Sequence, residues 1–268
     1  MRYIKDSISL SPEHDYPLLR QVLRSGLVTH DQLFEFTQLG NYESSRPTFN
    51  WRVRRLTKYG LTVRHTVPSA GKAFVYSITP AGELELAGIG EQFLTTPGKL
   101  DRNDKELQVA HSLELNNIHL SLLRAGLLVR WVPEIQLRSR NLSMGVRNGK
   151  VYDAIMTVRL DNGDATFALE YERTAKSKEE YAEVRNKFEA EQELDRFLYL
   201  ASTEDVLKFV SWQFRNSKRN VCFGLLADWY RRLLDTEVFN WTCHKYRPFR
   251  AALMGGADPT QISPGVLL

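Results

Sequence analysis

Three carboxylates around one predicted hairpin have the chemistry that hard divalent cations require. Asp153 lies in one β-rich run and Glu170 and Glu172 in the next, and Asn162-Gly163 between the runs is a strong signal for a two-residue turn. Such a turn would place Asp153 opposite Glu172 and Ile155 opposite Glu170, all on one side of the sheet. Directly opposed like charges are destabilising unless a cation lies between them. The pattern therefore predicts Mg²⁺ or Mn²⁺ bound by these carboxylates, an arrangement that suits phosphodiester cleavage.

A plainer structural interpretation stays open for the same hairpin. A two-stranded element with one solvated face also alternates apolar and charged residues, and it needs no metal ion to explain the charges.

The order of these residues resembles the PD-(D/E)xK nuclease core, in which an acidic strand residue is followed by an acidic pair on the next strand and then by lysines on a helix. Asp153, Glu170 and Glu172 match the acidic positions, although Glu172 stands where the commoner pattern has lysine. With a histidine-bearing helix upstream, the segment is similar to the replication-relaxation family, which includes the C-type mobilisation relaxases of plasmids. The resemblance covers roughly residues 17–200 and implies a winged helix followed by a nuclease-like core.

The resemblance also implies a lysine that stabilises the charged phosphorane. We favour Lys187 for this role, while Lys176 and Lys178 stay open, and an ion pair with Glu183 would explain Lys187 equally well. His111 falls on the apolar stripe of a predicted long helix. It is either a core residue or, as the family's histidine at this place suggests, a residue that reaches the metal ion or a phosphate.

Basic residues dominate the segment from Ser44 to Lys72, which contains no Asp or Glu. Periodicity predicts two short helices before it, the second capped by Thr29, and then a recognition helix over roughly Arg46–Tyr59 that ends at Gly60. Two alternating runs follow, as in a wing. We expect a winged helix-turn-helix that binds duplex DNA mainly through phosphates, with a protein-binding winged helix as the alternative. The expected DNA-binding residues are Arg46, Thr48, Asn50, Arg52, Arg54, Arg55, Lys58 and Lys72.

The expected fold class is α/β (α+β overall), with the winged helix-turn-helix followed by a restriction-endonuclease-like mixed sheet with flanking helices. The expected domains are residues 1–95 for DNA binding and 103–250 for the nuclease-like core, and 251–268 are expected to be a flexible tail. Further expected elements are an extended segment at Ile135–Leu137, a helix running to about Asp195, strands at Phe197–Ala201 and Val221–Leu226, and a helix at Val206–Phe214.

Composition bounds the class of protein. The chain has 268 residues, 43% of them hydrophobic, and no run approaches the ~18 apolar residues of a membrane span. The N-terminus lacks the apolar centre of a signal peptide, so we expect a cytoplasmic protein without membrane contacts. The two cysteines are not spaced as a zinc site. A net charge of +4 is a mild indication of polyanion binding.

These observations predict a DNA-binding, metal-dependent endonuclease of the relaxase type. The winged helix would hold duplex DNA near a transfer origin, and the nuclease site would nick one strand during plasmid mobilisation or conjugation. Mobilisation accessory proteins and a second copy of the chain are possible partners. The alternative is a winged-helix transcriptional regulator or replication accessory protein whose nuclease-like domain is not catalytic.

Overall fold

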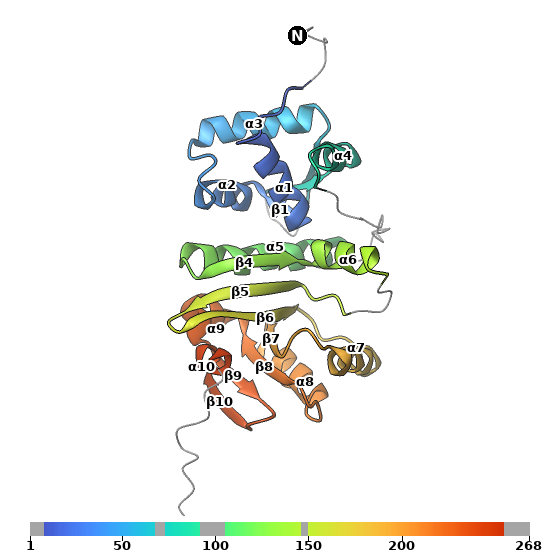
Figure 1. Ribbon diagram of the computed structural model, residues 1–268, viewed down its shortest axis with the longest axis vertical. Helices are drawn as coiled ribbons and strands as arrows, with labels where there is room; N and C mark the ends of the chain where they lie inside the picture. Colours follow the sequence, from blue (N-terminus) through green and yellow to red (C-terminus); the bar gives the residue numbers. More distant parts are fainter. Residues whose placement is uncertain (1–7, 68–72, 92–104, 146–149, 255–268) are drawn as a thin grey trace, which may run out of the picture. The chain divides into compact units, whose positions relative to one another are not determined.

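The structure is a computed structural model that describes residues 8–67, 73–91, 105–145 and 150–254. The chain divides into two compact units. The first contains the chain up to Gly126 together with Val132–Val151, and the second contains Leu127–Trp131 and the chain from Tyr152 onward. Both units combine helices and strands (Figure 1). The first has N-terminal helices with a small antiparallel sheet, and the second has a seven-stranded mixed sheet with flanking helices.

The first unit consists of helices around a three-stranded antiparallel sheet with the order β1-β3-β2. Its elements are α1 (Asp15–Ser25), β1 (Val28–Thr29), α2 (His30–Leu39), α3 (Arg46–Lys58), β2 (Thr62–Thr66), β3 (Phe74–Ile78), α4 (Pro80–Gly88), α5 (Lys105–Arg124) and α6 (Glu134–Ser143). Two predicted boundaries are confirmed. Thr29 caps α2 in a capping box, and Gly60 follows α3 with a φ of 72°. Thr79 caps α4 in a similar way, by accepting from the Gly82 amide.

Helix α5 belongs to this first unit, whereas the sequence-based boundary assigned it to the second. Gln32 explains the grouping, because its amide donates to the Leu113 carbonyl at 2.8 Å and to Asn117 Oδ1 at 2.7 Å. Asn116 donates to the Leu27 carbonyl at 2.8 Å. Leu120 is fully buried in the same core as α1, α2 and α3. These contacts satisfy polar groups that would otherwise be buried at a cost.

The second unit is built on a sheet with the order β10-β9-β8-β7-β6-β5-β4, in which β6, β7 and β8 are parallel. Its elements are β4 (Leu128–Pro133), β5 (Ala154–Leu160), β6 (Gly163–Glu172), α7 (Lys178–Ala190), β7 (Arg196–Ala201), α8 (Glu204–Gln213), β8 (Asn220–Leu225), α9 (Leu226–Arg232), a 3₁₀ turn η2 (Leu233–Asp235), β9 (Glu237–Asn240), β10 (Lys245–Pro248) and α10 (Phe249–Leu253).

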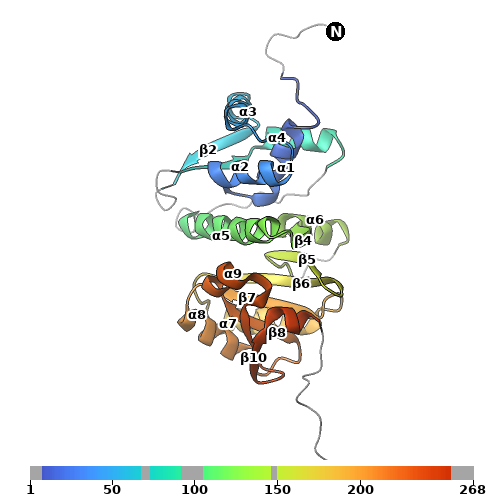
Figure 2. The same cartoon turned by 90° about the vertical axis from the view of Figure 1, so that its left-hand side faces the viewer.

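Helices cover both faces of this sheet (Figures 1 and 2). On one face, Phe188 of α7 packs on Tyr199, and Phe214 at the end of α8 packs on Phe223. On the other, Phe249 of α10 packs on Phe167 of β6. Residues that oppose each other across parallel or antiparallel strands share a face, so the first face, here called the α7–α8 face, also carries Glu170, Glu172 and Tyr199.

Strands β5 and β6 form the predicted hairpin, but the turn lies one residue earlier than predicted, which shifts the pairing register by two residues. Leu160 pairs with Gly163, so the two loop residues are Asp161 and Asn162 rather than Asn162 and Gly163. Gly163 is the first residue of β6 and carries the positive φ, at 126°. A glycine there is suited to a backbone conformation that L side chains rarely adopt.

This register changes which residues oppose each other. Ile155 pairs with Ala168, not with Glu170, and the continuation of the ladder brings Asp153 to Glu170 rather than to Glu172. A shift of two residues preserves the side on which every side chain lies. Asp153, Glu170 and Glu172 therefore still share one face, as predicted, although the opposition of Asp153 and Glu172 does not occur.

Other local predictions also need correction. The segment Ile135–Leu137 was expected to be extended, but strand β4 ends at Pro133 and these residues lie within helix α6. Helix α7 ends at Ala190 rather than near Asp195. The first residues of the predicted flexible tail belong instead to helix α10, where Ala252 and Leu253 are buried. Residues 255–268 lie outside the described part of the chain. None of the described helices is both long and apolar enough to span a membrane.

Candidate nucleic-acid interface

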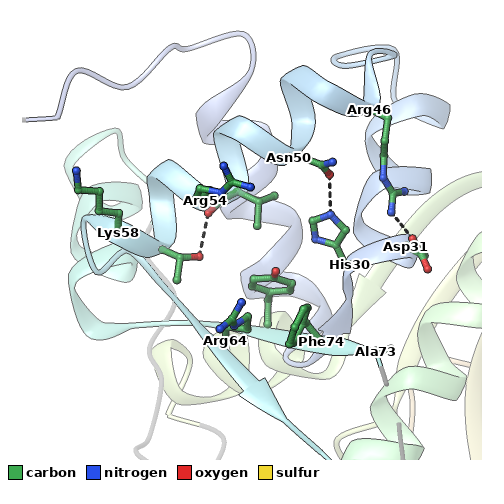
Figure 3. Close-up of a pocket in the computed structure, with 12 residues that line it drawn as sticks. His30, Asp31, Arg46, Asn50, Arg54, Lys58, Arg64, Ala73 and Phe74 are labelled. Atoms are coloured by element: carbon green, nitrogen blue, oxygen red, sulfur yellow. Dashed lines mark hydrogen bonds and ion pairs between the residues drawn. The ribbon is translucent and has the colours of Figure 1, made fainter. Parts of the chain in front are cut away.

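A groove with a volume of about 660 Å³ runs along α3 in the first unit (Figure 3). One wall is α3 itself, the start of α2 closes one end, and β2 and β3 form the opposite wall. Four cationic side chains and one acidic side chain line it: Arg46, Arg54, Lys58, Arg64 and Asp31. The groove is therefore strongly positive.

The sequence of α3 explains how one helix face comes to line the groove. Ser45 caps the helix by accepting from the Thr48 amide, and Pro47 lies in the first turn, where its missing N–H costs little. The buried side chains Phe49, Val53 and Leu56 fix the rotation of the helix. Residues spaced by four lie one above another, and this spacing aligns the groove residues Arg46, Asn50, Arg54 and Lys58.

The cations at the two ends of the groove differ in their contacts within the protein. Arg46 pairs with Asp31 and lies over the Phe34 ring, 4.6 Å from its centroid. Arg54 and Lys58 are exposed and form no ion pair within the described part of the chain. These two cations are therefore available to an external anion. From the opposite wall, Arg64 lies 4.3 Å above the Phe74 ring.

Asn50 in the middle of the groove is held by a histidine. His30 Nε2 and Asn50 Oδ1 are 2.8 Å apart, and Figure 3 shows the two side chains pointing toward each other. The His30 ring packs against Phe49 and Tyr76, with centroids 4.9 and 5.7 Å away. With Oδ1 facing the histidine, the amide nitrogen of Asn50 remains as the donor that can reach a ligand.

Two predicted DNA-binding arginines occupy the other side of α3. Arg52 pairs with Asp15 at 3.3 Å and with Glu43 at 3.2 Å, and its side chain is only 14% exposed. Arg55 also pairs with Asp15, which is fully buried, and donates to the Ser9 carbonyl at 3.2 Å. Both guanidinium groups neutralise a buried carboxylate inside the unit, so they do not line the groove.

The last two predicted positions add little to the groove. The Thr48 hydroxyl donates to Ser45 Oγ at 3.0 Å and so belongs to the helix cap. Lys72 lies outside the described residues. Sequence reasoning missed His30 and Phe74 as groove residues. The alternation of Thr62–Thr66 was the signal that could have added Arg64, because a strand places alternate residues on one side.

The predicted metal-binding residues lie in the second unit, on the α7–α8 face. Glu170 and Glu172 are two residues apart on β6 and are 5% and 4% exposed. Asp153 is half-buried, and its Oδ2 accepts from the Tyr171 amide at 2.7 Å. Glu172 Oε1 accepts from Lys176 Nζ at 2.6 Å. Asp153 and Glu172 are thus already partnered by a backbone amide and an ammonium group.

Lys176, not Lys187, is the lysine that reaches the carboxylates. Lys187 is exposed on α7 and forms no ion pair with the described residues. Burial lowers the pKa of Lys176, but Glu172 and then Glu170 raise it by more, and the net shift is upward. Lys176 is therefore charged at neutral pH, as its ion pair requires.

Tyr199 places a second polar group among these carboxylates. It pairs with Glu170 across β6 and β7, it is 1% exposed, and its hydroxyl has no hydrogen-bond partner within the described residues. Burial raises its pKa well above the usual range, and the neighbouring Glu170 raises it further. Tyr199 therefore remains a neutral phenol.

As they are paired here, these carboxylates do not form a divalent-cation site. Their oxygens are the donors that Mg²⁺ and Mn²⁺ prefer. However, no group of three or more His, Cys, Asp or Glu side chains in the described part of the chain is arranged to hold a metal ion. To bind a metal ion, Glu172 would have to give up its ion pair with Lys176. His111 lies on α5 in the first unit, whereas the carboxylates belong to the second.

Comparison of the chain with protein-family models, with curated proteins and with solved structures finds no match.

Proposed function

We propose that the first unit is a winged helix-turn-helix that binds duplex DNA, with α3 in the major groove and the β2–β3 hairpin as the wing. The element order α1-β1-α2-α3-β2-β3 around a small antiparallel sheet supports this topology. A major groove about 12 Å wide admits one α-helix.

One observation carries this proposal: Arg54 and Lys58, on one face of α3, form no ion pair with the residues that the structure describes. Arg54 and Lys58 project into the groove, and Arg64 faces them from the hairpin. The single acidic residue of the groove, Asp31, is occupied by Arg46. Phosphates are the ligands that such a surface attracts, while the Asn50 amide is a donor of the kind that pairs with base edges.

Two double variants of the same helix test the proposal. Arg54→Ala with Lys58→Ala removes two groove cations, so affinity for duplex DNA should fall and the slope of log K against log salt should become shallower by about 1.8. Arg52→Ala with Arg55→Ala removes the same charge from the Asp15 side. It should lower the melting temperature and, at temperatures where it is folded, leave the slope unchanged.

Fluorescence anisotropy of a labelled duplex across a salt titration measures both slopes. The proposal is refuted if the Arg54/Lys58 variant retains the parent's affinity and slope, or if the Arg52/Arg55 variant alone changes the slope. In that case α3 would be a protein-binding or purely structural helix.

A second candidate function is the metal-dependent nicking of one DNA strand, as in a mobilisation relaxase. The observation in its favour is the shared face of Asp153, Glu170 and Glu172, with Lys176 following at the end of β6. Against it stand the burial of both glutamates and the existing ion pair of Glu172. A regulator or accessory protein with a non-catalytic second unit is the competing possibility, and duplex binding by the first unit is compatible with both.

Metal linkage separates these two possibilities. A bound cation stabilises the folded state by about 2.7 kcal/mol at a hundredfold excess over its dissociation constant. A nuclease should therefore melt higher in Mn²⁺ than in chelator, and Asp153→Asn, which keeps an acceptor for the Tyr171 amide, should cancel most of this gain. Nicking of supercoiled plasmid should be lost in the same variant. Identical melting curves for the parent in Mn²⁺ and chelator would leave the non-catalytic alternative.

A further inference from the structure

Four aromatic side chains of the second unit form a continuous chain of ring contacts at the β10 end of the sheet. Centroid distances are 5.2 Å from Tyr246 to Phe239, 4.9 Å from Phe239 to Trp241 and 5.9 Å from Trp241 to Trp212. We call these four residues the aromatic strip. Trp212 is 53% exposed and Tyr246 67% exposed, so the two ends of the strip face solvent.

The topology explains why these rings are not in the core. Along β9, Val238 and Asn240 are buried, and Phe239 points to the opposite face of the strand. Helix α8 packs on β7 and β8. A pocket of about 280 Å³ lies between α8 and the outer strands, with Phe239 and Tyr246 in its lining together with the charged side chains Glu204, Lys208, Asp228 and Glu237. The α7–α8 face therefore has a pocket at its β9–β10 end.

The strip is held in a fixed position rather than lying loosely on the surface. Trp241 Nε1 donates to the Ser211 carbonyl at 2.6 Å, which ties the end of β9 to α8. Arg215 donates through Nη1 to the Trp212 carbonyl at 2.9 Å, and its guanidinium lies 4.5 Å from the Trp212 ring centroid. A rigid exposed ring loses little conformational entropy when a ligand binds.

Cations adjoin the Trp212 end of the strip. A groove of about 630 Å³ between α7 and α8 is lined by Lys178, Lys208 and Arg215, with Asp205 as its acidic member. Lys208 also contacts Glu204 at 3.4 Å, but both side chains are highly exposed, and such pairs contribute little. A planar aromatic surface thus borders a groove of net positive charge.

We propose that the aromatic strip and this groove bind single-stranded DNA, with unpaired bases stacked on Trp212 and Tyr246 and the backbone phosphates near Lys178, Lys208 and Arg215. Stacking needs a free base face, which single strands offer and duplexes do not. An acidic peptide would match the cations but would leave the exposed indole without a planar partner. The choice of DNA over RNA rests on the proposed function of the first unit, whereas the stacking argument does not.

Binding of the full chain to labelled twelve-residue oligothymidylate, followed by anisotropy, tests the proposal. Trp212→Ala and Tyr246→Ala should each weaken binding by about 5- to 150-fold, the range expected for one stacked base. Trp51→Ala is the matched control, because Trp51 is a comparably exposed tryptophan (54%) on α3. It should leave the affinity unchanged.

Competitors distinguish stacking from simple charge attraction. An abasic oligonucleotide of the same length carries the same phosphates without bases and should compete far more weakly than oligothymidylate. Equal competition by the abasic strand or by polyglutamate, or unchanged binding by both strip variants, would overturn the proposal. Tighter binding of oligouridylate than of oligothymidylate would overturn the choice of DNA.

The same assay separates this inference from the proposed function. The Arg54/Lys58 double variant should lose duplex binding and keep binding to oligothymidylate, since the groove of α3 lies on the first unit. Conversely, the parent protein could bind oligothymidylate through the aromatic strip and fail to bind duplex DNA. That result would refute the proposed function and leave this inference standing.

Discussion

His119 on α5 makes the stability of the first unit depend on pH in a direction that can be worked out. Its ring packs 4.9 Å from that of Phe36, and burial, followed by the charge of Arg24, lowers its pKa from 6.5 to about 3. In the unfolded chain the pKa returns to its ordinary value near 6.5. Below that pH the unfolded state binds a proton that the folded state does not. The stability contributed by neutral His119 is therefore complete above pH 6.5 and is lost as pH falls toward 3.

The loss can be estimated between two accessible pH values. At pH 7.5 the unfolded histidine is almost entirely neutral, so its protonation stabilises the unfolded state negligibly. At pH 5 it lies 1.5 units below its ordinary pKa, and the free energy of unfolding should be lower by about 2 kcal/mol for this residue alone. His119→Leu should remove this difference, whatever it does to the absolute stability.

Hydrogen exchange of the amides of α2 and α5 measures the free energy of opening of this unit without requiring the whole chain to unfold in one step. The readout is the change between pH 7.5 and pH 5 in the parent and in the variant. Phe36→Leu is the control, because it disturbs the same packing without a titratable group and should keep the parent's pH dependence. If parent and His119→Leu lose equal stability on acidification, the lowered pKa of His119 is not the cause.

Two further substitutions test the packing around α3 and α4, each by thermal and denaturant unfolding. Asp15→Asn should lower the free energy of unfolding by roughly 3 kcal/mol, because it leaves two arginines beside a buried neutral group. Asp31→Asn, which removes the carboxylate of an exposed pair, should lower it by less than about 1 kcal/mol. Equal effects of the two substitutions would contradict the buried network. Gly82→Ala should destabilise the protein by about 1–3 kcal/mol, because the new Cβ would lie 2.2 Å from the Leu61 carbonyl oxygen. At Gly88, in the same helix, a new Cβ has no heavy atom within 4 Å, so Gly88→Ala should be neutral or stabilising. A stabilising Gly82→Ala would contradict the contact.

The hairpin shows which part of a strand pairing a sequence can predict. Alternation correctly placed Asp153, Glu170 and Glu172 on one face, because that face depends only on whether residue numbers are odd or even. The register was wrong by two residues, a shift that alternation does not detect, since every apolar side chain stays on the same side. Choosing between the two turns depended on whether Gly163 lies in the loop or begins the strand, and both positions accept its positive φ.

Helix α3 shows a different limit. The sequence indicates a basic helix without acidic residues, and from that pattern Arg52, Arg54, Arg55 and Lys58 are equivalent. They differ because of Asp15, which lies far away in sequence and is buried beside one face of the helix. Helical periodicity can separate the two faces, but it does not say which of them a distant carboxylate will occupy.

Helix α5 and the C-terminal strands mark a third limit. The long helix was predicted from its periodicity, but its grouping with the first unit depends on single side-chain amides such as Gln32 and Asn116. Strands β9 and β10 are four residues each and were not predicted. Strands this short carry too few residues for alternation to be distinguished from chance.

The polar residues of the α7–α8 face are not explained by stability alone. A buried ion pair such as Glu172–Lys176 is often no more stabilising than well-packed apolar residues of similar volume, because both charges lose hydration. The same face holds Glu170 and the Tyr199 hydroxyl, and the rings of Phe188 and Phe214 pack against Tyr199. If the metal-linkage experiment reveals a chemical role for the second unit, the buried charges of Glu170 and Glu172 and the ammonium group of Lys176 are the groups that would perform it.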